Sequence, residues 1–246
     1  MKKIAYLSAL ALCLFSCSYD NYDEPAETFM GTLSDKISGS GFQTEVGDNG
    51  VRFKMLEISY NDDPTPWYFT CNQDGKFQDT KVFAGTYNIT PLGAFVPFVQ
   101  TDDEGDTIKN ESVTMKMKGV ITYDFTVDPF LVVTWVGDPS VSNGRITIQV
   151  KIERGTSDPD FQQDCVDIKL FVNSSSYYVG DNNYDSRYIV TVDNPDEVLG
   201  QTITLTTPEL PYSNATYYIR VGARINYAVD GIKRYNYNEP LAVEVP

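Results

Sequence analysis

Every second residue between Arg145 and Arg154 is aliphatic, and this alternation restricts the fold of the chain more than any other feature of its sequence. The aliphatic members are Ile146, Ile148, Val150 and Ile152. Polar residues stand between them, so an extended chain buries one face and exposes the other to water. Residues 166–172 and 203–205 repeat the period of two. The pattern predicts amphipathic β-strands.

Turn signals separate the alternating segments at regular intervals. They are Asp48-Asn49-Gly50, Asp74-Gly75, Asn143-Gly144 and Asp230-Gly231. Asn-Gly and Asp-Gly pairs favour tight hairpin turns. After the first 16 residues no segment shows a sustained helical period of 3.6. Many short strands at this spacing predict an all-β fold made of two consecutive β-sandwiches.

The N-terminus has the form of a secretory signal over residues 1–16. Lys2 and Lys3 precede the apolar run Ile4–Phe15, which is shorter than the roughly 20 residues of a membrane-spanning helix. Leu14-Phe15-Ser16-Cys17 follows and resembles the lipobox of bacterial lipoproteins, although Phe15 departs from the small or aliphatic residue usual there. The resemblance implies cleavage before Cys17 and acylation of its thiol and amine. The alternative is an ordinary signal peptide with a chance cysteine.

Residues 17–27 are predicted to form an acidic tether. Ser18–Pro25 is acidic and aromatic and contains no Lys or Arg, so it buries little apolar surface. An acidic stretch directly after the acylated cysteine resembles the surface-export signal of Bacteroidetes lipoproteins. We therefore expect a lipid-anchored outer-membrane protein that faces the cell exterior. A plain linker on a periplasm-facing lipoprotein is the alternative.

Composition narrows the classes of function. The chain has 19 basic and 34 acidic residues, and removal of Lys2 and Lys3 leaves a net charge of −17, which argues against a nucleic-acid partner. The absence of histidine removes Ser-His and Cys-His catalysis and the commonest metal ligand. Cys71 and Cys165 are about 90 residues apart and are predicted to be free or buried thiols. No cofactor is predicted.

Residues 28–126 resemble the transthyretin-like, carboxypeptidase-regulatory-like sandwich. Three pieces occur in the order found in that family, namely Gly31-Thr32-Leu33-Ser34-Asp35, Asp74-Gly75-Lys76-Phe77 and Ala84-Gly85-Thr86-Tyr87. Glycine at position 75 suits the positive φ of a hairpin turn. Glycine at position 85 lets the chain bend before Tyr87 packs inward.

Residues 127–246 resemble a fibronectin type III-like sandwich. Val133-Thr134-Trp135 is followed by the alternating strand and later by Tyr217, Ile219, Val221 and Ala223 at period two. The resemblance implies that Trp135 is the core tryptophan and that Tyr217 lies at the tyrosine corner. Asp128-Pro129 interrupts the pattern near the boundary, and two separately folded domains are expected.

Lipobox, acidic tether and two sandwiches together resemble a family of Bacteroidetes surface lipoproteins of unknown function. Members of that family are typically encoded beside SusC-like transporters and SusD-like glycan-binding lipoproteins. The resemblance implies a non-catalytic accessory of a glycan-uptake system, with polysaccharide and SusC/SusD-like proteins as partners. A structural, adhesive or docking protein of the cell surface is the alternative.

Tyrosine and tryptophan in polar, turn-rich stretches are the candidate sugar-binding residues. Tyr178 and Tyr184 flank Asp181 in a segment predicted to be an exposed hairpin tip, and Trp67 with Tyr68 is the next candidate pair. Sugar C–H groups stack on aromatic faces, and carboxylates accept hydrogen bonds from sugar hydroxyl groups. Packing between strands or domains is the alternative role of these rings.

Three weaker patterns complete the set. Asp181, Asn183 and Asp185 have the spacing of a calcium loop, but Ser186 stands where that loop needs glycine, so a polar hairpin is favoured. Asp106-Thr107-Ile108 resembles the short sequence at which Bacteroidetes O-glycosylate exported proteins, with Thr107 as acceptor. No spacing marks the paired carboxylates of a glycosidase, so the prediction is no enzyme, with a glycoside-active enzyme as a further alternative.

Overall fold

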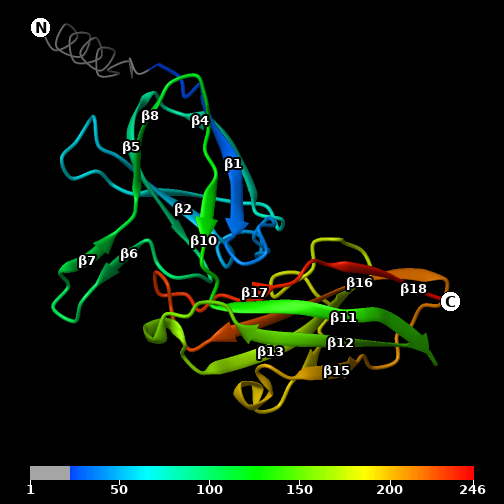
Figure 1. Cartoon of the computed structure of the whole chain (residues 1–246). Helices are drawn as coiled ribbons and strands as arrows, with labels where there is room; N and C mark the ends of the chain where they lie inside the picture. Colours follow the sequence, from blue (N-terminus) through cyan, green and yellow to red (C-terminus); the bar gives the residue numbers. More distant parts are fainter. Residues whose placement is uncertain (1–22) are drawn as a thin grey trace, which may run out of the picture.

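The chain is built almost entirely from strands, as predicted, and they form two β-sandwich units in sequence (Figure 1). The computed structural model describes residues 23–246. The predicted signal segment and Cys17 lie outside this range. The helices within the described residues are two short 3-10 turns, η2 (Pro159–Phe161) and η3 (Pro195–Val198). No helix within residues 23–246 is long and apolar enough to span a membrane.

The first unit contains ten strands in two main sheets and one hairpin. They are β1 (Glu27–Asp35), β2 (Arg52–Glu57), β3 (Trp67–Thr70), β4 (Lys76–Val82), β5 (Gly85–Leu92), β6 (Val99–Thr101), β7 (Thr107–Asn110), β8 (Val113–Met117), β9 (Val120–Thr122) and β10 (Phe125–Val127). One sheet has the order β10-β1-β4, with β9 also paired to β1, and the other has the order β3-β2-β5-β8. Strands β6 and β7 form the hairpin.

Phenylalanine rings fill the space between these two sheets. Phe53 is fully buried and lies 4.8 Å from Phe69, 4.4 Å from Phe77 and 5.5 Å from Phe125, between ring centroids. Tilted and offset ring pairs of this kind add to the stabilisation that burial provides. Tyr87 is also buried, as its predicted inward packing requires.

Gly75 makes the turn that the sequence predicts there. Its φ is +80°, and a Cβ at this position would lie 2.6 Å from the Leu33 carbonyl oxygen and 2.8 Å from the Phe42 nitrogen. Both the backbone conformation and the close approach of two other segments therefore require glycine.

The second unit contains eight strands in two sheets. They are β11 (Leu131–Ser142), β12 (Arg145–Arg154), β13 (Cys165–Asn173), β14 (Val190–Thr191), β15 (Thr202–Thr206), β16 (Ala215–Ile225), β17 (Asn236–Tyr237) and β18 (Leu241–Val245). The sheet orders are β11-β12-β15 and β14-β13-β16, with β17 and β18 both paired to β16.

The strand predicted most directly from the alternation is confirmed. Strand β12 spans Arg145–Arg154, and its four alternating aliphatic side chains are buried. Asn143 and Gly144 have φ values of 51° and 67° and form the turn before it. Tyr217 makes the predicted corner contact, since its hydroxyl oxygen accepts a hydrogen bond from the Tyr212 backbone nitrogen at 3.1 Å.

The expected position of Trp135 at the centre of the core is wrong. The resemblance implied a central core tryptophan, but this side chain is only half-buried. Strand β11 pairs with β12 alone and is therefore the edge of its sheet. The Trp135 indole packs at the margin of the core, and its Nε1 donates a hydrogen bond to the Glu239 carbonyl at 2.9 Å.

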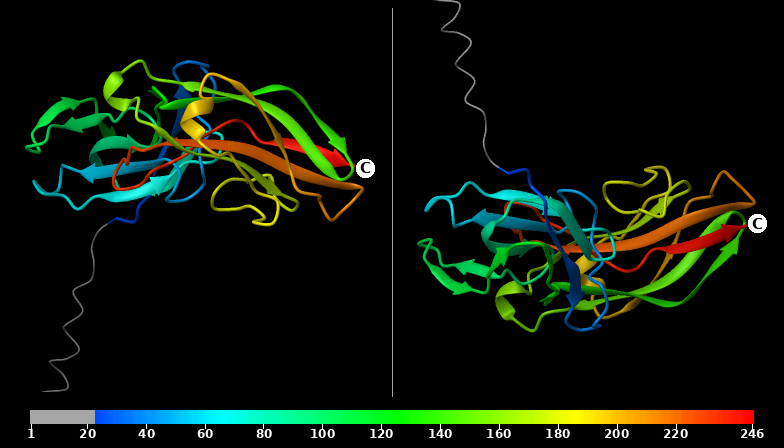
Figure 2. Two further views of the ribbon diagram at one scale, coloured as in Figure 1. Left: turned by 90° about the horizontal axis from the view of Figure 1, so that it is seen from below. Right: turned by 90° about the horizontal axis from the view of Figure 1, so that it is seen from above.

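A buried arginine joins the two units, which are in contact in both views of Figure 2, with the first unit on the left and the second on the right. Arg220 on β16 is fully buried. Its Nη1 donates to the Thr44 carbonyl at 2.9 Å and to Gln73 Oε1 at 3.0 Å in the first unit. Its Nε donates to the Asn238 carbonyl at 2.8 Å in the second. Burial lowers the pKa of Arg220 to about 10, so the side chain stays charged at neutral pH.

Two further contacts cross the same boundary. Asn236 Nδ2 donates to the Ala94 carbonyl at 2.7 Å, and Arg234 Nε donates to the Gly50 carbonyl at 2.8 Å. The apolar core is also continuous from one unit to the other. Strand β10 crosses the boundary expected between residues 126 and 127 and pairs with β1 of the first unit.

We expect Arg220→Met to lower the free energy of unfolding by about 3 kcal/mol or more, because carbonyl groups of both units lose a buried charged donor. Denaturant unfolding followed by circular dichroism measures the change. Arg187→Met is the matched control. Arg187 is largely exposed and pairs with Asp185 at the surface, so its loss should cost less than about 1 kcal/mol. Equal effects of the two variants would contradict the proposed role of Arg220.

The two described cysteines are free and buried, as predicted. Burial raises the pKa of the Cys71 thiol to about 12 and that of Cys165 to about 11. Both thiols are therefore protonated at pH 8 and shielded from reagents. We expect neither to react with Ellman's reagent in the native protein and both to react in denaturant. Rapid reaction of the folded protein would show that a thiol is accessible.

Candidate functional site

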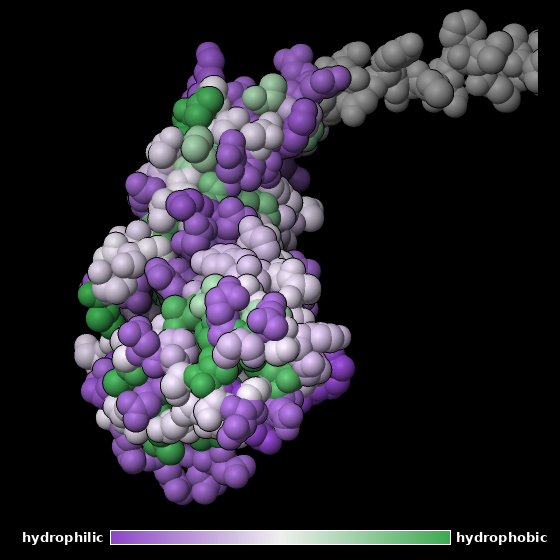
Figure 3. Space-filling model, turned by 90° about the vertical axis from the view of Figure 1, so that its right-hand side faces the viewer, coloured by the Kyte–Doolittle hydropathy of each residue, from purple (hydrophilic) through white to green (hydrophobic). Residues whose placement is uncertain are grey.

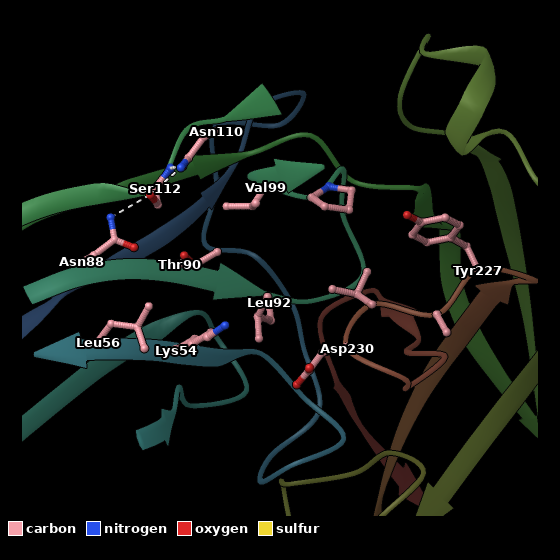
Figure 4. Close-up of a pocket in the computed structure, with 13 residues that line it drawn as sticks. Lys54, Leu56, Asn88, Thr90, Leu92, Val99, Asn110, Ser112, Tyr227 and Asp230 are labelled. Carbon is pink, nitrogen blue, oxygen red and sulfur yellow. Dashed lines mark hydrogen bonds between the residues drawn. The ribbon is translucent and has the colours of Figure 1, made fainter. Parts of the chain in front are cut away.

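A cleft of about 370 Å³ lies where the second unit meets the outer face of a sheet of the first unit (Figure 4). The register of β2 and β5 builds its floor, with Lys54 opposite Thr90 and Leu56 opposite Asn88. Side chains alternate along a strand, so these four point away from the core, where Phe53 and its inward-facing neighbours lie. The floor is thus an outward sheet face that the second unit partly covers.

Amide and hydroxyl groups form a network along one side of the cleft. Asn88 Nδ2 donates to Ser112 Oγ at 2.7 Å and to Thr114 Oγ1 at 3.2 Å. Ser112 Oγ in turn donates to Asn110 Oδ1 at 2.6 Å. These bonds fix the amide so that Asn88 Oδ1 remains an acceptor without a side-chain partner within residues 23–246. The network therefore holds the Asn88 amide in a fixed orientation along the side of the cleft, where its oxygen can accept a hydrogen bond from a ligand.

Residues 227–230 of the second unit form the opposite wall. Tyr227 is half-buried, with its ring 5.6 Å from Phe130 and 5.2 Å from Phe161 in edge-to-face contacts. Burial raises the pKa of its hydroxyl group, which stays protonated at neutral pH. Asp230 lies on the same wall, and its carboxylate accepts a hydrogen bond from Arg52 Nη2 at 2.7 Å. An aromatic ring and a neutralised carboxylate thus face the floor.

Lys54 is the one cationic side chain that lines this cleft. It forms no ion pair or side-chain hydrogen bond within the described residues, whereas the nearby Arg52 is committed to Asp230. Its ammonium group can therefore donate to a ligand oxygen without first breaking an internal bond.

Tyr68 is the predicted binding residue that lies nearest the cleft. Tyr68 lies on β3, opposite Lys54 of β2, and is exposed. The Arg52 guanidinium lies 4.1 Å from the centroid of its ring. Its neighbour Trp67 points to the other face, where its ring packs 5.8 Å from Phe69. Tyr68 can therefore take part in a surface contact, while Trp67 is largely occupied by the core.

The segment around Asp181 is not the exposed tip that was expected, because it packs against the first unit. Asn182 Nδ2 donates to the Val46 carbonyl at 2.7 Å, and Gly180 lies so close to Glu45 that a Cβ would clash with its carboxylate. Asp181 is half-buried, and its backbone nitrogen donates to the Tyr237 hydroxyl at 3.2 Å. This segment forms part of the boundary between the two units.

Tyr178 and Tyr184 do not form one stacking surface. Tyr184 is half-buried with its ring 5.3 Å from Phe171. Tyr178 is 50% exposed and instead contacts Tyr177, which in turn contacts Tyr218, with centroid distances of 6.3 and 5.9 Å. Tyr178 and Tyr177 are therefore exposed, while Tyr218 is half-buried, and of the three only Tyr178 is a predicted binding residue.

The residues with the spacing of a calcium loop make hydrogen bonds within the protein. Asp185 forms a bidentate pair with Arg187, whose Nη2 lies 2.6 Å from its Oδ2. Asn183 Oδ1 accepts from Asn173 Nδ2 at 3.0 Å. Two of the three proposed ligands thus already have partners, and no group of three or more acidic or cysteine ligands occurs within residues 23–246.

Thr107, the proposed glycosylation acceptor, is exposed at the start of β7. Its neighbour Ile108 is 65% exposed, so the short motif is accessible on the β6–β7 hairpin. Modification at this residue stays a prediction.

Comparison with known proteins gives a family match. The sequence model for the N-terminal domain of DUF3823, described as a protein of unknown function, matches residues 28–128. The crystal structure of a DUF3823 family protein from Bacteroides uniformis is 33% identical, with a TM-score of 0.83, and the match covers 90% of this chain and 100% of that one. No curated protein matches the chain.

Two more distant structures share the fold. One is from Bacteroides uniformis and is described as a "putative carbohydrate binding protein". It is 22% identical with a TM-score of 0.65, and the match covers 91% of this chain and all of that one. The other is a DUF3823 family protein from Parabacteroides merdae, at 18% identity and a TM-score of 0.64, with 90% of this chain and all of that one covered.

Proposed function

The chain belongs to the DUF3823 family of Bacteroides β-sandwich proteins, and from that membership we propose that it is a non-catalytic, glycan-binding lipoprotein of the outer-membrane surface. The cleft between the sandwiches carries the proposal. It combines hydroxyl, amide and ammonium groups with aliphatic side chains such as Leu56 and Leu92. A sugar ring presents hydroxyl groups and apolar C–H faces together, so it is complementary to such a lining.

The size and rigidity of the cleft also favour a sugar ligand. Its volume of about 370 Å³ lies within the range of about 300–1,000 Å³ typical of ligand clefts. The buried contacts between the units fix both walls before a ligand arrives, which reduces the entropy lost on binding. Shallow sites with few direct bonds bind in the micromolar to millimolar range. Many surface copies engaging one long chain would raise that affinity.

The acids of the cleft support the proposal of binding without catalysis. Glycoside hydrolysis by the common mechanism needs two carboxyl groups on either side of the scissile bond. Among the lining residues only Asp230 has a carboxylate, and it is bonded to Arg52. The Bacteroides uniformis structure described as a "putative carbohydrate binding protein" supports the choice of ligand class by analogy.

The anchoring proposal rests on the lipobox and on where the described chain begins. Strand β1 starts at Glu27, ten residues after Cys17, and the chain enters the first unit at the end remote from the second (Figure 1). Acylation at Cys17 would hold that end at the membrane and direct the cleft and the second unit outward. Two acyl chains or more are needed for stable anchoring.

A docking or stalk protein is the competing function. Docking faces usually carry an apolar patch of several hundred Å². On the side seen in Figure 3, apolar side chains form small spots separated by polar ones. Among residues 23–246, the three most exposed large apolar side chains are Tyr60, Val120 and Ile108, which lie on different segments of the first unit. This distribution favours glycan binding over docking.

Affinity electrophoresis of the chain without residues 1–17, in gels carrying plant and host polysaccharides, tests the binding. We expect at least one polysaccharide to retard the protein. Lys54→Ala combined with Thr90→Val should weaken retardation about tenfold or more, since each lost hydrogen bond is worth about 1 kcal/mol. Lys151→Ala, at a half-buried strand position of the second unit that does not line the cleft, is the control and should bind normally. Equal retardation of the cleft variant would place the site elsewhere, and no retardation of the wild type would favour docking.

Acylation at Cys17 is tested by feeding the cells a labelled fatty acid. The wild-type protein should carry the label and fractionate with the outer membrane, whereas Cys17→Ala should be unlabelled.

Protease added to intact cells should digest the wild type if it faces outward. Cross-linking in the same cells should join it to a SusC-like or SusD-like protein if it serves such a pair. A soluble, unlabelled wild type would contradict the anchoring proposal.

A further inference from the structure

A second groove, of about 320 Å³, lies between the loop after β1 and the strand β11. The end of β1 contributes Asp35, the loop contributes Ser38 and Gln43, and the second unit contributes Trp135 and the segment that ends at Glu239. Figure 1 shows this loop above β11 and β17. None of its lining residues lines the first cleft. We propose that this groove is a separate subsite for a neutral sugar, an inference that rests on the proposed function.

Trp135 supplies a fixed aromatic surface in the groove. The ring is half-buried at the edge of the sheet, and its Nε1 is held by the Glu239 carbonyl at 2.9 Å. The pairing of β11 with β12 shifts register between Val136 and Ser140, so the regular pairing is interrupted one residue beyond Trp135. An aromatic ring that is already fixed loses little conformational freedom when a sugar stacks on it.

Asn238 supplies a hydrogen-bond donor that has no acceptor. The residue is 95% buried and lines the groove, and its Nδ2 has no partner within residues 23–246. Its Oδ1 accepts from the Val221 backbone nitrogen at 2.9 Å, which fixes the orientation of the amide because a flipped amide would oppose two donors. Buried polar groups are almost always paired. The nitrogen itself is shielded from solvent, so a ligand hydroxyl oxygen would satisfy this amide after a small shift of the side chains that line the groove.

The charges of the groove select against acidic sugars. Asp35 and Glu239 are its charged lining residues, and no lysine or arginine lines it. Asp35 Oδ1 accepts from the backbone nitrogens of Ile37 and Ser38, while the exposed Glu239 carboxylate has no hydrogen-bond partner within the described part of the chain. Carboxylates accept hydrogen bonds from sugar hydroxyls but repel uronates and sulfates. The first cleft, with Lys54 on its floor, has the opposite preference.

Nuclear magnetic resonance distinguishes the two sites directly, because the chain has only two tryptophans. Trp67 lies in the first unit and serves as the internal control for Trp135. The chain without residues 1–17 is titrated with cellohexaose, mannohexaose and xylohexaose as neutral probes and with oligogalacturonate as the acidic one. We expect a neutral probe to shift the Trp135 indole signal and the Asn238 side-chain amide saturably. The Trp67 indole signal should not move, and oligogalacturonate should leave Trp135 unchanged.

Two variants separate a binding role from a structural one. Asn238→Asp keeps the oxygen that accepts from Val221 but replaces the unpaired donor with an acceptor, and it should weaken the Trp135 response at least tenfold. Trp135→Leu should abolish the response of the Asn238 amide. The variant with Lys54→Ala and Thr90→Val should leave both responses intact.

The outcomes distinguish this inference from the proposed function. If gels retard the protein through Lys54 and Thr90 but no neutral probe shifts Trp135, the second subsite is overturned and glycan binding stands. An undiminished response in Asn238→Asp would also overturn it. If oligogalacturonate shifts Trp135 as strongly as the neutral probes, the selection against acidic sugars is wrong. If neither gels nor titrations show binding, both proposals fail.

Discussion

The Arg220 guanidinium is buried without a carboxylate in direct contact, and it makes six hydrogen bonds to oxygen atoms of Gln43, Thr44, Gln73, Val179 and Asn238. These acceptors come from both sandwiches. The centroid of the Tyr237 ring lies 4.3 Å from the Arg220 guanidinium carbon. The Tyr237 hydroxyl donates a hydrogen bond to the buried Glu45 carboxylate, so Tyr237 stands between the positive charge of Arg220 and the negative charge of Glu45. A buried charge that is satisfied this completely tolerates little displacement of its acceptors. The relative position of the two sandwiches therefore depends on this residue.

Both grooves are consequences of that fixed position. Each has one wall from the first sandwich and one from the second, so neither would exist on a separated unit. The floor of the first cleft would be an ordinary exposed sheet face, and Trp135 an ordinary residue at a sheet edge. What distinguishes them is the partial cover that the other unit supplies. The proposed binding surfaces thus arise from the packing of the two units more than from any one loop.

Sequence reasoning was accurate where a side chain's environment depends on its own strand. The alternation through Ile146–Ile152 and through Tyr217, Ile219 and Val221 correctly identified inward-facing residues. The same alternation puts Arg220 on an outer face, yet it is buried, because loops of the first sandwich cover that face. Lys54, Asn88 and Thr90 were missed for the same reason, since nothing local indicates which outer face another domain covers. Tyr68 is exposed, as its place beside a polar turn suggested, whereas Tyr184 is half-buried because its partner Phe171 lies on another strand.

The position of β1 has a mechanical consequence for a protein held at its N-terminus. The strand is hydrogen-bonded on both edges, antiparallel to β4 on one side and parallel to β9 and then β10 on the other. A pull along β1 loads these bonds in shear, so many must break together before the strand moves. The second sandwich lies beyond β10 and carries no tension unless a ligand there is pulled. Drag on a captured chain would therefore be transmitted through the boundary around Arg220 into the sheet best arranged to resist it.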